Sequence, residues 1–115
     1  MPSDLGRKYL ADIAENIRLA REFLGGADAA SFFADKRTYY AVVRCLEIIS
    51  EASRRLDAEV VDRHPEIPWH QIRSSGNLYR HEYGDVDHEI VHVTVTDDLP
   101  VLLTVVRAEL AASRT

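Results

Sequence analysis

Apolar residues recur every three or four positions along the first part of the chain, the spacing that places them on one face of an α-helix. The pattern follows Ser3 and Asp4, both favoured N-caps, and it stops at Gly25 and Gly26, which a helix terminus favours. Its members are Leu5, Tyr9, Ile13, Ile17, Ala20 and Leu24. A helix is therefore predicted over residues 5–24, with a short turn or helix after it at 28–33.

A second long helix is predicted over residues 35–56, with a wider apolar stripe. The stripe comprises Tyr39, Val42, Leu46, Ile49, Ser53 and Leu56, and it is widened by Val43, Cys45 and Ile48. An apolar surface of this width indicates burial on two sides, for instance against the domain core and against a partner subunit.

Residues 57–67 are broken by Pro65 and Pro68, and a third helix is predicted to start at Pro68 or Trp69, since proline suits the first helical turn. This helix would carry Gly76 in its interior. Glycine there costs about 1 kcal/mol relative to alanine unless close packing requires it.

The last segment is ambiguous, because residues 90–95 are rich in β-branched side chains, which favour a strand. No second strand candidate exists to pair with it, so we predict a helix with a kink or break at Pro100. The predicted fold is all-α, an antiparallel bundle of four to five helices, with residues 1–115 forming one domain.

Composition restricts the class of protein. The 115 residues are 46% hydrophobic and 29% charged, with a net charge of −5, which indicates a soluble globular protein. The acidic balance argues against non-specific nucleic-acid binding by the whole surface, but not against a local basic site. A single cysteine, Cys45, excludes an intrachain disulfide. With no signal peptide and no apolar run of membrane length, we expect a cytoplasmic protein without a membrane partner.

Residues 67–81 contain no Asp or Glu, although the chain as a whole is acidic. The window holds His70, Arg73, Asn77, Arg80 and His81, and Tyr83 follows it closely. A histidine can take the proton of an RNA 2′-hydroxyl, and an arginine can hold the charge that builds on the phosphate. These residues predict metal-free phosphodiester cleavage, with Asn77 as an orienting group. The alternative is a polar helix end that only caps or packs.

Two other patterns have structural alternatives. Residues 88–92 match H-E-x-x-H, a zinc-hydrolase motif with His88 and His92 as ligands, and Glu109 is a third-ligand candidate by sequence distance alone. A chance match on a helix face is the favoured interpretation, and neither a metal nor another cofactor is expected. Arg44 and Glu47 belong either to a salt-bridged solvent face or to the lining of the cleft that holds the histidine.

Several segments, spread over nearly the whole length, carry a resemblance to a known family. They are residues 9–13 (YLADI), 35–52 (with RCLEIISEA at 44–52), 64–69 (HPEIPW), 76–83 (GNLYRHEY), 86–87 and 97–100 (DDLP). On these the chain resembles the HepT-like toxins of the HEPN superfamily.

The resemblance implies a helical bundle that dimerises. In this family two copies of a motif (Arg, four to six residues, His, any residue, Tyr) meet in a cleft at the dimer interface. It implies metal-independent RNA cleavage, including cleavage of transfer RNA. It also implies a partner, the minimal nucleotidyltransferase antitoxin MntA, which neutralises the toxin by transferring AMP to the motif tyrosine. By position, the histidine is His81 and the tyrosine is Tyr83.

The chain departs from the family motif at one position. Where the family has an arginine directly before an asparagine, this chain has Gly76 before Asn77. The phosphate ligand would then be Arg80, adjacent to His81, or Arg73, one helical turn before Asn77. The alternative function is a catalytically inactive module that docks a minimal nucleotidyltransferase. In that case Gly76, in place of the motif arginine, indicates the loss of catalysis.

Overall fold

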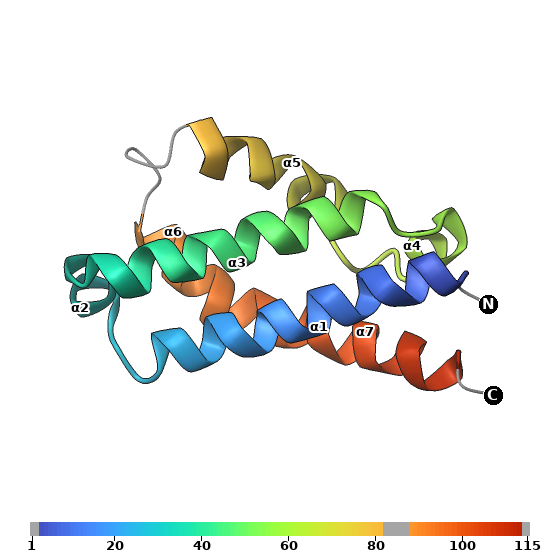
Figure 1. The fold of residues 1–115 in the computed structure, drawn as a ribbon, viewed down its shortest axis with the longest axis horizontal. Helices are drawn as coiled ribbons and strands as arrows, with labels where there is room; N and C mark the ends of the chain where they lie inside the picture. The colour runs from blue at the N-terminus through green and yellow to red at the C-terminus, as the bar shows by residue number, and fades with distance from the viewer. Residues whose placement is uncertain (1–2, 82–87, 114–115) are drawn as a thin grey trace.

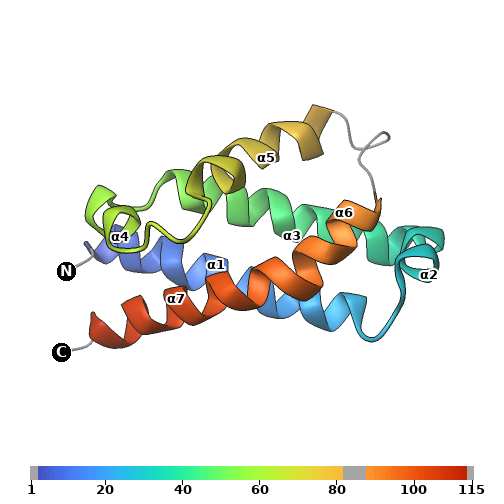
Figure 2. The ribbon, with the colours of Figure 1, turned by 180° about the vertical axis from the view of Figure 1, so that it is seen from behind.

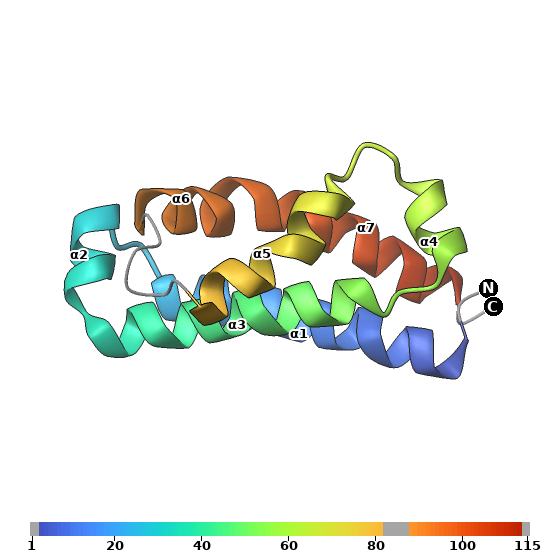
Figure 3. The ribbon, with the colours of Figure 1, turned by 90° about the horizontal axis from the view of Figure 1, so that it is seen from above.

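The computed structural model describes residues 3–81 and 88–113, and the backbone alone for residues 77–81. The described residues are helical with short connections, which confirms the all-α prediction. The helices are α1 (Asp4–Leu24), α2 (Ala29–Ala34), α3 (Lys36–Arg54), α4 (Ala58–Arg63), α5 (Trp69–His81), α6 (His88–Val93), the π-helical turn η1 (Thr94–Asp98) and α7 (Leu99–Ala112). The four long helical segments alternate in direction, and the two ends of the described chain lie close together (Figures 1 and 3).

The first predicted helix is confirmed almost residue for residue. The Ser3 side chain accepts a hydrogen bond from the Gly6 backbone N–H at 2.9 Å, which caps the start of α1. The helix ends at Gly25, whose φ of 57° lies in the left-handed region that glycine adopts without strain. Leu10, Ile13 and Ile17 are fully buried. This face packs against α3 and α7, as seen from behind in Figure 2.

The wide apolar stripe of α3 is buried within this chain. Cys45 and Val43 are each 4% exposed, although they lie on different sides of the helix. The side with Val43 is the side of Ser50, seven residues later, where α5 packs against α3. A partner subunit is therefore not needed to explain the stripe, and dimerisation stays a prediction that other grounds must support.

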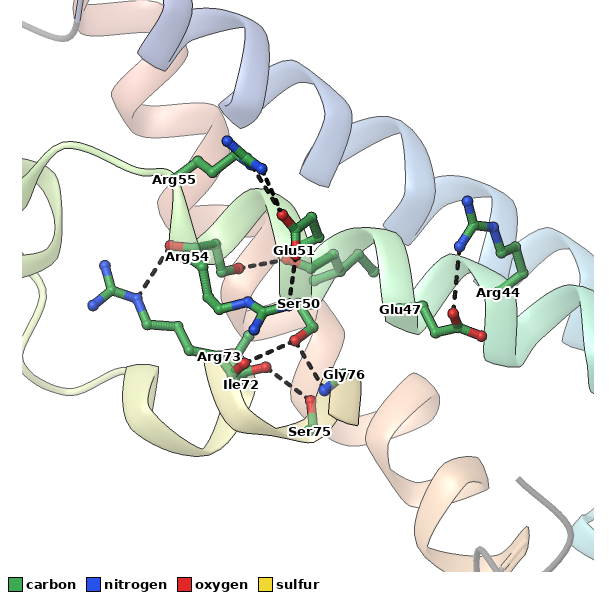
Figure 4. A network of polar contacts seen from close by, with 12 residues as sticks. Arg44, Glu47, Ser50, Glu51, Arg54, Arg55, Ile72, Arg73, Ser75 and Gly76 are labelled. Carbon is green, nitrogen blue, oxygen red and sulfur yellow. Dashed lines mark hydrogen bonds and ion pairs between the residues drawn. The ribbon is translucent and has the colours of Figure 1, made fainter. Parts of the chain in front are cut away.

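One serine joins α5 to α3 at the closest approach of the two helices. Ser50 Oγ accepts a hydrogen bond from the Gly76 N–H at 3.0 Å and donates one to the Arg73 carbonyl at 3.1 Å (Figure 4). A Cβ atom built on Gly76 would lie 2.6 Å from Ser50 Oγ. Close packing against Ser50 thus explains the glycine inside α5. The sequence alone had left open whether such packing exists.

Between α3 and α5 the structure has a short helix, α4, that the proline pattern did not predict. Its last turn is tied to α7 by Glu109, which is 7% exposed. Arg63 donates two hydrogen bonds to the Glu109 carboxylate, and His64 Nε2 lies 2.8 Å from it. The hydrogen bonds from Arg63 lower the pKa of Glu109 below its ordinary value, so this carboxylate is charged at neutral pH.

The C-terminal segment is helical throughout residues 88–112, which confirms the choice of helix over strand. The interruption predicted at Pro100 takes the form of the π-helical turn Thr94–Asp98, directly before the helix that holds the proline in its first turn. Because proline has no N–H, the preceding turn cannot keep regular α-helical bonding. Within residues 3–81 and 88–113, none of the helices combines the length and apolar character that crossing a bilayer requires.

The contact between Gly76 and Ser50 predicts a specific stability change. Gly76→Ala would improve helix propensity, yet its Cβ must displace the Ser50 side chain, which is 1% exposed. We expect the free energy of unfolding to fall by about 1–3 kcal/mol, the usual cost of overpacking. Urea denaturation followed by circular dichroism measures it.

Gly26→Ala is the matched control, because a Cβ at Gly26 meets no atom within 4 Å. Its free energy of unfolding should stay within about 0.5 kcal/mol of the parent value. Equal effects of the two substitutions would show that the close approach of α5 to α3 does not matter for stability.

Candidate active site

Helix α5 carries the carboxylate-free window and runs antiparallel to α3. The two helices are held in register where Ser50 meets Gly76 and Arg73 (Figure 4). Beyond Gly76, α5 continues for more than one turn to His81, while α3 extends from Ser50 back towards its own start. The backbone of α5 therefore continues from Gly76 in the direction of the part of α3 that carries Glu47 and Arg44.

The structure describes the predicted site residues to different extents. The side chains of Asn77, Arg80 and His81 lie outside the described part of the chain, as does the whole of Tyr83. Their roles therefore stay predictions. The backbone of α5 reaches His81 as one helix, which fits the predicted placement of the window at the end of the third helix.

Arg73 is described in full, and its side chain makes a bond to α3. Its Nε donates a hydrogen bond to the backbone carbonyl of Ser53 at 3.1 Å (Figure 4). Ser53 is fully buried, and its own hydroxyl is bonded to the Ile49 carbonyl. Arg73 thus has a structural contact near the C-terminal end of α3, away from the end of α5 where His81 lies.

Arg44 and Glu47 form an ion pair at 3.3 Å and also line a cavity, and that this cavity is the cleft that holds the histidine stays a prediction. The cavity has a volume of about 270 Å³ and lies where α1, α3 and α5 meet. Its lining comprises Tyr9, Asp12, Arg44, Glu47, Ile48, Glu51, Ala52, Arg54, Arg55 and Gly76. The two sequence interpretations are therefore compatible, since a salt-bridged pair forms part of a cavity wall.

The other charged groups of the cavity are paired as well. Glu51 accepts hydrogen bonds from Arg54 and Arg55, and the bond from Arg55 contributes most to lowering the pKa of Glu51. The guanidinium of Arg55 also lies 6.0 Å from the centre of the Tyr9 ring. A carboxylate held ionised by arginine is a poor proton acceptor near neutral pH. Glu51 is therefore not suited to act as the general base of this region.

The described contacts do not support the zinc-hydrolase alternative. The ring of His88 stacks on Phe33 with centroids 4.4 Å apart, and His92 Nε2 lies 2.8 Å from the carbonyl of Ala27. Both histidines thus pack α6 against α2 and the connection before it, while Glu109 on α7 binds Arg63 and His64 at the end of α4. Among residues 3–81 and 88–113 no three His, Cys, Asp or Glu side chains are grouped as metal ligands.

Sequence reasoning missed Ser50 and Tyr9. Ser50 was not singled out in the sequence, and Tyr9 was a member of the apolar pattern of the first helix. The signal for Ser50 was the glycine inside α5, because a close helix approach needs small residues on both sides. For Tyr9 the sequence held no such signal, since its position on the cavity wall depends on how α1 and α3 pack.

Comparison with known proteins gives consistent results. A model of the ribonuclease HepT-like family matches residues 13–109. A probable ribonuclease HepT from Thermococcus cleftensis is 41% identical over 96 residues, which cover 84% of this chain and 87% of that protein. A putative RNase from Methanocaldococcus jannaschii is 31% identical over 100 residues, covering 87% of this chain and 83% of the relative.

A longer protein of the same archaeon, named a gamma-glutamylcyclotransferase and putative RNase, is 32% identical over 94 residues, 82% of this chain and 42% of its own length. No solved structure matches the chain. The family match spans most of the helical bundle, from the middle of α1 to Glu109 on α7. The chain belongs to the HepT-like ribonuclease family.

Proposed function

We propose that this protein is a HepT-type toxin, a metal-independent endoribonuclease that cleaves RNA, with transfer RNA as the expected substrate. The observation that carries the proposal is the family match together with the course of α5, which extends past its anchor on Ser50 to His81. The names of the relatives, a probable ribonuclease and putative RNases, support the reaction class.

In this proposal His81 is the general base and an arginine is the phosphate ligand. Arg73 is committed through its Nε to the Ser53 carbonyl, which favours Arg80 for the phosphate. An arginine at position 76 would require the Ser50 side chain to move, because a Cβ there would lie 2.6 Å from Ser50 Oγ. The departure from the family motif is thus tied to the close helix contact, and Asn77, one residue on, is proposed to orient the reacting groups.

The reaction would proceed in the RNA itself. His81 takes the proton of the 2′-hydroxyl, and the 2′-oxygen attacks the adjacent phosphorus while the bond to the 5′-oxygen breaks. Arg80 stabilises the additional negative charge on the phosphate oxygens. The leaving 5′-oxygen takes a proton from solvent and His81 returns its proton to solvent, so the products are a 2′,3′-cyclic phosphate and a 5′-hydroxyl end.

The proposed assembly and regulation follow the family resemblance. Two copies would bring two His81 motifs together at a dimer interface in the cytoplasm. The antitoxin would be a minimal nucleotidyltransferase of the MntA type, with Tyr83 as the acceptor of AMP. An adenylyl group two residues from His81 would add negative charge and bulk where RNA must approach, which is a physical reason for neutralisation.

The first prediction concerns cleavage of total transfer RNA by the purified protein with EDTA present. The parent protein should cleave, and His81→Ala should lose at least about 100-fold of the rate, the usual contribution of a general base. His70→Ala is the matched control, because His70 is an exposed histidine in the first turn of the same helix. Denaturing gel electrophoresis follows the products.

Loss of cleavage on adding EDTA, or full activity in His81→Ala, would contradict the proposal. Mass spectrometry of the same preparation shows whether Tyr83 carries AMP. Absence of cleavage by protein with unmodified Tyr83, together with a stable complex with a nucleotidyltransferase, would instead support the inactive docking module.

A second prediction separates the two arginines. Arg80→Ala should lower kcat/KM for RNA by about 100-fold or more, the effect of removing one donor from a developing anion. Arg73→Ala should chiefly lower the free energy of unfolding, by about 1 kcal/mol, because it removes the hydrogen bond to the Ser53 carbonyl. Steady-state kinetics and urea denaturation on both variants measure these effects, and the reverse pattern would assign the phosphate to Arg73.

A further inference from the structure

The charged residues of α3 and its C-cap all lie on one side of the helix. At about 100° per residue they fall within about 100° of arc, and Tyr40 falls in the middle of the same sector. The cations are Lys36, Arg37, Arg44, Arg54 and Arg55, and the carboxylates are Glu47 and Glu51. Five cations and two carboxylates give this face a net charge of +3 in a chain whose net charge is −5. We call these residues, together with Tyr40, the α3 face.

The two carboxylates of the α3 face are already paired within it. Arg44 binds Glu47, while Arg54 and Arg55 both bind Glu51 (Figure 4). The positive excess therefore persists at the surface, and the side chains of Arg44 and Arg55 are 68% and 56% exposed. Such a face attracts an anionic ligand that extends along the helix, over roughly 28 Å from Lys36 to Arg55 at 1.5 Å per residue.

Tyr40 adds an aromatic surface between the cations. It is 54% exposed, and its ring lies 5.9 Å from that of buried Tyr39, which supports it from below. Lys36 lies one turn before it, with Nζ 3.5 Å from the centre of the Phe33 ring. Arg44 lies one turn after it. An exposed ring with cations one turn away on either side is the combination that binds single-stranded nucleic acid, through stacked bases and neutralised phosphates.

The α3 face also lies at the right place relative to the proposed active site. Because α5 runs antiparallel to α3 from the Ser50–Gly76 anchor, Arg44 and Tyr40 lie on α3 in the direction in which α5 proceeds to His81. Arg44 belongs at the same time to the cavity between α1, α3 and α5. An RNA strand lying along the α3 face would thus pass beside the end of α5.

We propose that the α3 face is the surface along which single-stranded RNA lies, with a base stacked on Tyr40 and neighbouring phosphates bound by Lys36 and Arg44. This rests on the proposed ribonuclease function and adds the substrate contacts outside its catalytic motif. A protein partner is the competing occupant. Charge favours RNA, because the α3 face is positive and the phosphates of a strand lying along the helix are negative.

The test measures RNA affinity separately from cleavage. In a His81→Ala background, which leaves the RNA intact, fluorescence anisotropy gives the Kd for a short fluorescein-labelled single-stranded RNA. Tyr40→Ala should raise the Kd about tenfold, the typical effect of losing one stacked base, whereas Tyr40→Phe keeps the ring and should stay within about twofold. Phe23→Ala, which removes an exposed aromatic residue of α1, is the matched control and should leave the Kd unchanged.

The salt dependence provides a second readout that does not depend on Tyr40. Lys36→Gln should reduce the slope of log K against log salt concentration by about 0.7, the value for one phosphate contact of a single strand. An unchanged slope together with an unchanged Kd in Tyr40→Ala would overturn the proposal. If the parent still cleaves transfer RNA in that case, the ribonuclease function stands and only the α3 face is wrong.

Analytical ultracentrifugation of the same variants separates RNA from a protein occupant. The proposal expects Tyr40→Ala to sediment as the parent does while it binds RNA more weakly. A change in oligomeric state on Tyr40→Ala would assign the α3 face to a contact between copies of the chain and overturn the proposal. Failure of the His81→Ala protein to bind RNA at all would also overturn it.

Discussion

Ser50 sits at the contact on which the rest of the candidate site depends. Its hydroxyl both accepts from the Gly76 N–H and donates to the Arg73 carbonyl, so one buried side chain fixes the position of α5 along α3 and the distance between the two helices. Everything that follows in α5, up to His81, takes its place from this anchor. Glycine at position 76 makes this contact possible, because a Cβ there would lie 2.6 Å from Ser50 Oγ.

The same contact connects the unusual motif with the packing. A chain with Gly76 before Asn77 has no arginine at the position where the family has one, yet it keeps two arginines nearby on α5. Arg73 donates to the Ser53 carbonyl and helps to hold α5 on α3, whereas Arg80 lies beyond the anchor. A division of labour between a structural and a phosphate-binding arginine is thus consistent with both the sequence and the described contacts. Five of the fourteen lysines and arginines of this acidic chain lie on the neighbouring α3 face.

Much of the fold was predictable because its signals are local. Caps at Ser3 and Gly25 and the three-four stripes gave α1 and α3 closely, and the lack of a strand partner for residues 90–95 decided between helix and strand. The hydrogen bond between Ser50 and Gly76 could not be predicted, because it joins residues 26 positions apart and depends on helix packing. For the same reason the H-E-x-x-H motif is weak evidence for a metal site: its spacing is local, but what His88 and His92 contact depends on how α6 packs against α2 and Ala27.

The most direct test of the central claim is the chemistry of the RNA ends that the protein produces with EDTA present. If His81 acts as a base on the 2′-hydroxyl, mass spectrometry of the fragments should find 2′,3′-cyclic phosphate and 5′-hydroxyl ends. Fragments with 5′-phosphate and 3′-hydroxyl ends would contradict the account, because water rather than the 2′-oxygen would then have attacked the phosphorus.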